Sequence, residues 1–122
     1  MAPYERFRAW RECHALALTV YRATETFPVH ERYGLTSQAR RAAVSAAANI
    51  VEGSARRGSK EFRRFLDVAL GSLSEVGYIL RLSRELGFLR EEAWSELHGV
   101  QSRAHFLTWR LYESVARASR QG

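Results

Sequence analysis

The feature that most constrains the fold is the spacing of apolar residues, which recurs at three and four positions along most of the chain. Between Phe62 and Leu80, for example, apolar side chains stand at positions 62, 66, 69, 73, 76 and 80. This spacing places them on one side of an α-helix, and no stretch alternates as a half-buried strand does. The only prolines, Pro3 and Pro28, leave all later segments without a helix-breaking residue. The sequence therefore predicts an all-α fold.

Residues typical of helix ends divide the chain into four segments. Pro28 ends the first because the residue before a proline disfavours helical geometry, and Thr36 or Ser37 is expected to cap the second. Ser59 is expected to cap the third, and Gly87 to end it in a left-handed conformation. The predicted helices span about 4–26, 36–57, 59–86 and 90–119. Short connections favour antiparallel neighbours, so we predict one domain over residues 1–122, an up-down-up-down antiparallel four-helix bundle.

A row of polar residues lies on one face of the second predicted helix: Gln38, Arg41, Ser45, Asn49 and Glu52. If the two helices pack antiparallel around the turn at Gly58, residues that are nearly the same number of positions before and after Gly58 face each other. This sets Ser45 against Ser72 and Arg41 against Glu75, and it predicts an Arg41–Glu75 ion pair within a polar ladder between the second and third helices. We interpret the ladder as structural, fixing the register of the two helices. The alternative is a ligand or catalytic pocket lined by Arg41, Asn49 and Glu52.

Apolar residues on the third and fourth predicted helices cover more than the single stripe that a monomeric bundle needs. The additional residues beside these stripes are Phe65, Ile79, Trp94, Phe106, Trp109 and Tyr112. We interpret them as an oligomer interface between copies of the chain. The alternative is a wide core whose edge is formed by amphipathic aromatic side chains.

Basic residues dominate the charge of the chain, which is +6 at pH 7 with Lys60 as the only lysine. One group surrounds the second turn and another recurs every seven residues along the fourth helix: Arg56, Arg57, Lys60, Arg63 and Arg64, and then Arg103, Arg110 and Arg117. Arginine donates two parallel hydrogen bonds to a phosphate, so these positions predict nucleic-acid binding. The alternative is a compositional bias of the genome, with these side chains solvated or paired with nearby acids.

Residue types that would carry catalysis are not arranged for it. The four histidines, His14, His30, His98 and His105, form no pair four positions apart, and no glycine-rich phosphate loop occurs. Cys13 falls within the apolar pattern of the first helix, where we expect it to be a buried core residue. We therefore expect no catalytic residue, metal or cofactor. No apolar run is long enough for a signal or membrane-spanning segment, so we expect a cytoplasmic protein without a membrane partner.

Many of these residues also carry a family resemblance. The segments are Phe27-Pro28, Gly34-Leu35-Thr36-Ser37-Gln38, Arg40-Arg41-Ala42-Ala43-Val44-Ser45, Asn49-Ile50 with Glu52-Gly53, Lys60-Glu61-Phe62, and Ala69-Leu70-Gly71-Ser72-Leu73-Ser74-Glu75. They resemble the bacterial four-helix bundle family named for the 23S rRNA intervening-sequence protein. The resemblance implies an up-down bundle, often a ring-like homopentamer, with no catalytic activity. It also implies kinship to the accessory variability protein of diversity-generating retroelements, a basic pentamer that binds reverse transcriptase and nucleic acid.

Two functions follow as hypotheses. In the first, the chain is a non-enzymatic homo-oligomer, a pentamer by the resemblance, that binds nucleic acid through its basic patches, RNA in preference to DNA. In the second, it is an adaptor that holds a protein partner, such as a reverse transcriptase, through the outer aromatic residues Trp94, Trp109 and Tyr112. Phosphate contacts weaken as salt rises, whereas apolar contacts with a protein partner do not, so salt dependence distinguishes the two.

Overall fold

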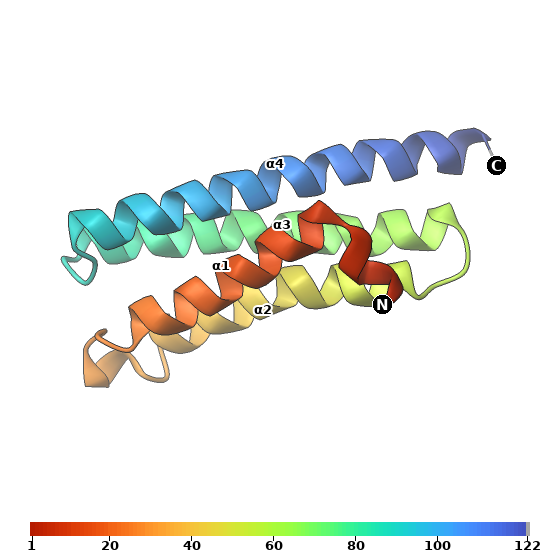
Figure 1. Ribbon diagram of the computed structural model, residues 1–122. Helices are drawn as coiled ribbons and strands as arrows, with labels where there is room; N and C mark the ends of the chain where they lie inside the picture. The colour runs from red at the N-terminus through yellow and green to blue at the C-terminus, as the bar shows by residue number, and fades with distance from the viewer. Residues whose placement is uncertain (122) are drawn as a thin grey trace.

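The computed structural model describes residues 1–121, which form four long helices packed side by side (Figure 1). The elements in chain order are η1 Pro3–Arg6, α1 Arg8–Thr24, η2 Val29–Glu31, α2 Leu35–Ser54, α3 Ser59–Glu85 and α4 Glu91–Gln121. Successive helices run in opposite directions, and each packs against two neighbours, so that α1 also lies beside α4. Within the described residues there is no strand. The predicted all-α, up-down-up-down bundle is confirmed.

The start of the first helix differs from the predicted range of 4–26. Pro3–Arg6 forms a short 3-10 helix, and Phe7 is extended, with φ −85° and ψ 124°, before α1 begins at Arg8. The extended residue turns the Phe7 ring toward α3, where its centroid lies 5.7 Å from that of Phe62. The helix is thus interrupted at Phe7, where the ring packs against Phe62. Helix propensity, which is a local property, does not predict this interruption. The helix also ends earlier than predicted, at Thr24.

The start of α2 uses a different cap from the two predicted hydroxyl residues. Gly34 is the N-cap, and the Leu35 N–H donates to Glu31 Oε1 at 3.0 Å. Thr36 and Ser37 lie inside the first turn, and neither caps the helix. The carboxylate of η2 thus does what a hydroxyl at the cap position would do, which is to satisfy one of the unpaired N–H groups of the first turn.

The two ends of α3 both depend on glycine in the left-handed region of φ. Gly58, with φ 87°, is the N-cap, and Ser59 is the first helical residue, so the predicted Ser59 cap is wrong by one position. Gly87 has φ 84°, and its N–H donates to the Arg84 carbonyl at 3.0 Å, as the predicted left-handed ending requires. The helix ends at Glu85 with Leu86 as C-cap, and Gly87, the residue after the cap, allows the chain to reverse into α4.

The core is asymmetric, because α2 contributes almost only small residues to it. Its buried positions are Thr36, Ala39, Ala42, Ala43, Ala46, Ala47, Ile50 and Gly53. The other helices contribute larger buried side chains to the core, among them Leu16, Leu66, Leu73, Leu80 and Leu97. Helix α3 approaches α2 closely at Gly53, where an added Cβ would stand 2.8 Å from both Phe62 Cδ1 and Phe65 Cβ. Small residues on α2 therefore set how closely α2 and α3 pack.

No helix within residues 1–121 combines the length and the apolar character needed to cross a membrane.

Candidate nucleic-acid interface

The first predicted basic group surrounds the turn between α2 and α3. Its arginines are ordered by an aromatic ring, since the guanidinium carbons of Arg56 and Arg64 lie 5.1 and 5.2 Å from the centroid of the Phe65 ring. Arg64 is also 3.2 Å from Glu61, and the hydrogen bonds it donates lower the pKa of that carboxyl group. Among residues 1–121, Arg56 has no carboxylate within ion-pair distance. Stacking on Phe65 thus holds a partly uncompensated pair of guanidinium groups at the surface.

The remaining members of this group lie in the same turn and in the first turns of α3. Arg57 and Lys60 are exposed, whereas Arg63 is half-buried. None of the three has a carboxylate within 4.0 Å in the part of the chain that the structure describes. The structure therefore brings all five predicted residues to one turn, and only Arg64 is neutralised by an acid.

The second predicted group, on α4, separates into two parts. Arg103 Nε lies 3.7 Å from Glu12 Oε2, so this side chain bridges α4 and α1. Arg110 is exposed, and its guanidinium lies 5.7 Å from the centroid of the Phe106 ring. Arg117 is exposed further along the same helix. Arg110 and Arg117 are accordingly open to an anionic ligand, while Arg103 already has a partner.

Antiparallel packing collects positive charge at one end of the bundle. The half that contains the α2–α3 turn also contains the N-terminus and the last turns of α4 (Figure 1), and it comprises residues 1–14, 50–68 and 108–121. It holds eleven of the 19 Lys and Arg residues but six of the 13 Asp and Glu residues. We call this half the basic end. Sequence reasoning missed the contribution of Arg6, Arg8 and Arg11, which are far from the turn in sequence but lie in the same half of the bundle.

The centre of the predicted polar ladder is confirmed. Ser45 Oγ and Ser72 Oγ lie 2.9 Å apart across the α2–α3 interface. Asn49 Nδ2 donates to the Ser45 carbonyl at 2.8 Å and to Ser45 Oγ at 3.1 Å. All three residues are half-buried. The ladder therefore holds α2 against α3 through hydroxyl and amide groups.

The charged residues at the ends of the ladder do not pair, and the predicted Arg41–Glu75 ion pair is wrong. Both side chains are exposed, and no carboxylate lies within 4.0 Å of Arg41 among residues 1–121. Gln38 and Glu52 are exposed as well. An exposed pair gains little Coulomb energy in water and loses side-chain entropy, so these long side chains remain solvated. The alternative pocket of Arg41, Asn49 and Glu52 does not form, since Arg41 instead lines a cleft shared with α1.

The residues predicted to form an oligomer interface have different environments. Ile79 is 4% exposed and belongs to the core, so its assignment to a surface is wrong. Phe65 is half-buried beside Arg56 and Arg64. Trp94 is half-buried too, stacked on His98. These three side chains therefore pack mainly against residues of their own chain and leave little apolar surface for a second copy.

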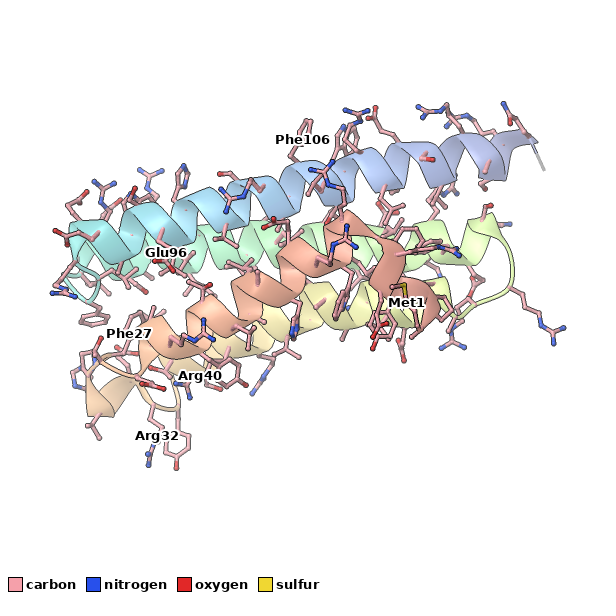
Figure 2. The ribbon with its side chains drawn as sticks, viewed as in Figure 1. Met1, Phe27, Arg32, Arg40, Glu96 and Phe106 are labelled. Atoms are coloured by element: carbon pink, nitrogen blue, oxygen red, sulfur yellow. The ribbon has the colours of Figure 1, made fainter. Side chains whose placement is uncertain are left out.

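Two aromatic side chains of α4 are exposed. Phe106 is 56% and Trp109 44% exposed, and Phe106 projects outward from the helix (Figure 2). Tyr112, half-buried, stacks on Trp109 with ring centroids 5.5 Å apart. Phe106 and Trp109 line a shallow groove of about 610 Å³. Its other lining residues are Ser74, Gln101, Ser102 and His105. We call it the outer groove.

Cys13 occupies the predicted core position. It is fully buried, and its Sγ lies 3.5 Å from Thr108 Oγ1 on α4. Burial raises the pKa of the Cys13 thiol to about 11. The thiol is therefore protonated near neutral pH, which is the state of an inert structural cysteine and not of a nucleophile.

The fold and its charge distribution define a class of protein: an up-down four-helix bundle with one strongly basic end. A family model described as 23S rRNA-intervening sequence protein matches residues 5–106, and the chain belongs to this family. A crystal structure from Bacteroides thetaiotaomicron, described as a protein with unknown function from the S23 ribosomal protein family, is similar in fold, with a TM-score of 0.74 and 19% identity over 85% of this chain and 97% of that chain. No curated protein matches the chain.

Proposed function

We propose that this protein is a non-enzymatic, self-associating bundle protein that binds nucleic acid, RNA in preference to DNA, through its basic end. The observation that carries the proposal is the concentration of positive charge there, eleven basic residues against six acidic ones. A surface of this kind attracts a polyanion irrespective of its sequence. The family's name refers to 23S rRNA, which supports RNA as the preferred polymer.

The contacts would be made to phosphates. Arg56 and Arg64, stacked on Phe65, present planar guanidinium groups of restricted orientation, and Arg57 and Lys60 extend the surface around the turn. Guanidinium groups held in this way lose less side-chain entropy when they bind an anion. Binding of this type positions a strand and does not read its sequence.

Self-association is proposed to use the outer groove. Phe106 and Trp109 expose large apolar surfaces to solvent, and a second copy of the chain would cover them. The family resemblance implies a homopentamer. A closed ring would repeat the basic end once per subunit, and such repetition raises the overall affinity for a long strand.

The test is fluorescence anisotropy with labelled RNA and duplex DNA of equal length at about 50 and about 200 mM salt. The triple variant Arg56→Gln, Arg57→Gln, Lys60→Gln should weaken RNA binding at least tenfold and reduce the dependence of affinity on salt. Arg81→Gln is the matched control, since Arg81 is exposed in the other half of the bundle and paired with Glu85 at 2.9 Å. Equal affinity of the triple variant and the parent protein would contradict the proposal.

The second candidate function is that of an adaptor for a protein partner such as a reverse transcriptase. The exposure of Trp109 and Phe106 favours it, whereas Trp94, half-buried under Arg84, adds little surface. In this case binding of the partner would survive high salt and be lost in Trp109→Ala, while the triple variant at the turn would bind the partner normally.

A further inference from the structure

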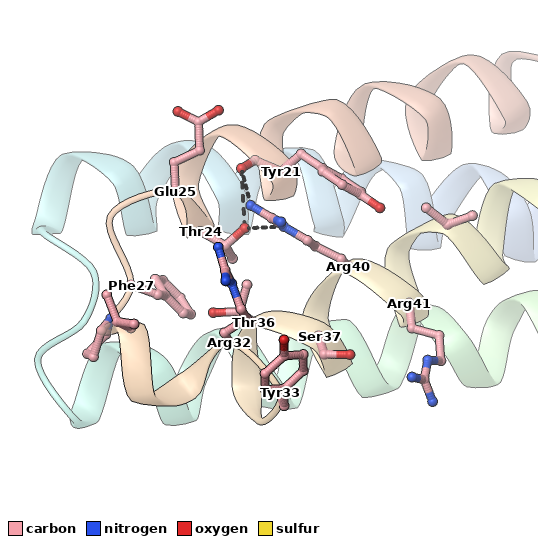
Figure 3. A pocket seen from close by; sticks show the side chains of 13 residues that line it. Tyr21, Thr24, Glu25, Phe27, Arg32, Tyr33, Thr36, Ser37, Arg40 and Arg41 are labelled. Carbon is pink, nitrogen blue, oxygen red and sulfur yellow. Dashed lines mark hydrogen bonds between the residues drawn. The ribbon is translucent and has the colours of Figure 1, made fainter.

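A cleft of about 700 Å³ lies at the end of the bundle opposite the basic end. It is formed where the end of α1, the η2 segment and the start of α2 meet (Figure 3). Its lining includes Tyr21, Thr24, Glu25, Arg32, Tyr33, Arg40 and Arg41. Its volume is in the range of small-molecule sites, roughly 300–1,000 Å³.

Arg40 is held in place on one wall of this cleft. Its Nε donates to Thr24 Oγ1 at 2.8 Å, and its Nη2 donates to the Tyr21 carbonyl at 3.2 Å. The guanidinium carbon also lies 4.6 Å from the centroid of the Tyr21 ring. Thr24 is buried, and its own hydroxyl donates to the Val20 carbonyl at 2.8 Å, which directs an oxygen lone pair toward Arg40. The side chain is thus ordered before any ligand arrives.

The ordered guanidinium keeps hydrogen-bonding capacity. Arginine carries five N–H donors, and only two atoms of Arg40, Nε and Nη2, have partners among residues 1–121. Its Nη1 has none within the described part of the chain. A ligand in the cleft can therefore accept hydrogen bonds from Arg40 without breaking those that position it.

The charge around the cleft is not compensated. Arg32 and Arg41 also line it, and none of the three arginines has a carboxylate within 4.0 Å in residues 1–121. Glu25 is the one acid in the lining, and its carboxylate points away from Arg40 (Figure 3). Guanidinium groups that line one cleft repel one another, and an anion bound at Arg32 and Arg40 offsets this repulsion.

We propose that the cleft binds a phosphate monoester attached to a planar ring, the chemistry shared by a mononucleotide and by the phosphorylated end of a nucleic-acid strand. Arg40 belongs to α2 and Arg32 follows η2, so the two side chains approach from different segments and can donate to different oxygens of one tetrahedral dianion. The cleft is larger than a phosphate group, and Tyr33, 90% exposed at its rim, offers a ring on which a base can stack. This site shares no residue with the basic end.

The test is isothermal titration calorimetry with adenosine 5′-monophosphate, adenosine and inorganic phosphate. Adenosine 5′-monophosphate should bind at least tenfold more tightly than either fragment. Equal binding of adenosine and its monophosphate would overturn the proposal, and so would failure of every phosphorylated probe to bind. A short RNA with a 5′-phosphate is compared with the same RNA carrying a 5′-hydroxyl. If the 5′-phosphorylated RNA binds more tightly than its 5′-hydroxyl form and Arg32→Gln abolishes the difference, the site takes a strand end. Equal affinity of the two RNAs assigns the site to the free nucleotide, because both RNAs have the same contacts with the basic end.

Arg32→Gln should weaken binding of the monophosphate at least tenfold. Arg41→Gln should weaken it less, because Arg41 lines the cleft with its guanidinium group turned away from Arg40 (Figure 3). Both side chains are exposed and form no ion pair within residues 1–121, so these variants should fold. Arg90→Gln is the matched control, an exposed arginine at the same end but outside the cleft lining. An equal loss in Arg90→Gln would show diffuse charge attraction and overturn the proposal. The triple variant at the α2–α3 turn should bind the monophosphate normally, which separates this site from the basic end.

Discussion

The hydroxyl groups of Ser45 on α2 and Ser72 on α3 lie 2.9 Å apart and join the two helices at the middle of their interface. The alanines of α2 that surround Ser45 offer only smooth apolar contact, which alone specifies register weakly. A hydrogen bond between two half-buried hydroxyls is lost when one helix slides along the other. Asn49 strengthens the arrangement, since its amide also donates to Ser45 Oγ at 3.1 Å.

Ser72→Ala should destabilise the protein by about 1 kcal/mol, the usual net value of one hydrogen bond. Equilibrium urea unfolding measures the change. The double variant Ser45→Ala, Ser72→Ala should lose less than the sum of the two single variants, because each single variant already removes the shared bond. Additive losses would show that the two hydroxyls do not interact in solution.

Gly53→Ala should destabilise the protein by about 1–3 kcal/mol through overpacking. The new Cβ would lie 2.8 Å from Phe65 Cβ, an atom next to the backbone that cannot move aside without shifting α3. Thermal and urea unfolding monitored by circular dichroism are the measurements.

Gly71→Ala is the control for this substitution. Gly71 lies inside α3, and an added Cβ would have no atom within 4 Å. It should therefore stabilise the protein by about 0.5–1 kcal/mol through helix propensity. If both substitutions changed the free energy of unfolding in the same direction, overpacking at Gly53 would not explain the loss of stability in Gly53→Ala.

The Cys13 thiol predicts a loss of stability at alkaline pH. Its pKa is raised from 9.0 to about 11 by burial, so the folded state retains a proton that the unfolded chain releases above pH 9. The contribution of this thiol to the free energy of unfolding is constant below about pH 9 and decreases as pH rises toward 11. From linkage, the free energy of unfolding should fall by about 1 kcal/mol between pH 8 and pH 10 through this group alone.

The measurement is urea unfolding of the parent protein and of Cys13→Ala at both pH values. Other groups titrate in the same range, so the quantity of interest is the difference between the two proteins. The parent protein should lose about 1 kcal/mol more than the variant. Identical losses would show that the thiol is accessible to water in the folded state, in which case it would also react rapidly with a thiol reagent.

Trp109→Ala should reduce the mass of the assembly if the outer groove joins copies of the chain. Light scattering at several protein concentrations measures the mass, and Leu18→Ala provides the control. Leu18 and Trp109 are both 44% exposed, but Leu18 lies on α1, away from the groove. An unchanged mass in Trp109→Ala, or an equal decrease in Leu18→Ala, would place the interface elsewhere.

Local patterns in the chain were sufficient to predict four antiparallel helices and the left-handed ending at Gly87. They also predicted the contact of Ser45 with Ser72, because distances from a tight turn determine which residues of two antiparallel helices face each other. The same reasoning was wrong for Arg41 and Glu75. Facing positions do not ensure an ion pair when both side chains are long enough to reach water.

The sequence by itself determined the class of fold and the overall positive charge, since periodicity and composition are properties of the chain alone. Only the tertiary structure decided where that charge gathers and where a cleft opens. Arg6 and Arg56 are far apart in sequence, and antiparallel packing places them in the same half of the bundle. The cleft around Arg40 likewise depends on how α1 and η2 pack beside α2, which no local pattern indicates.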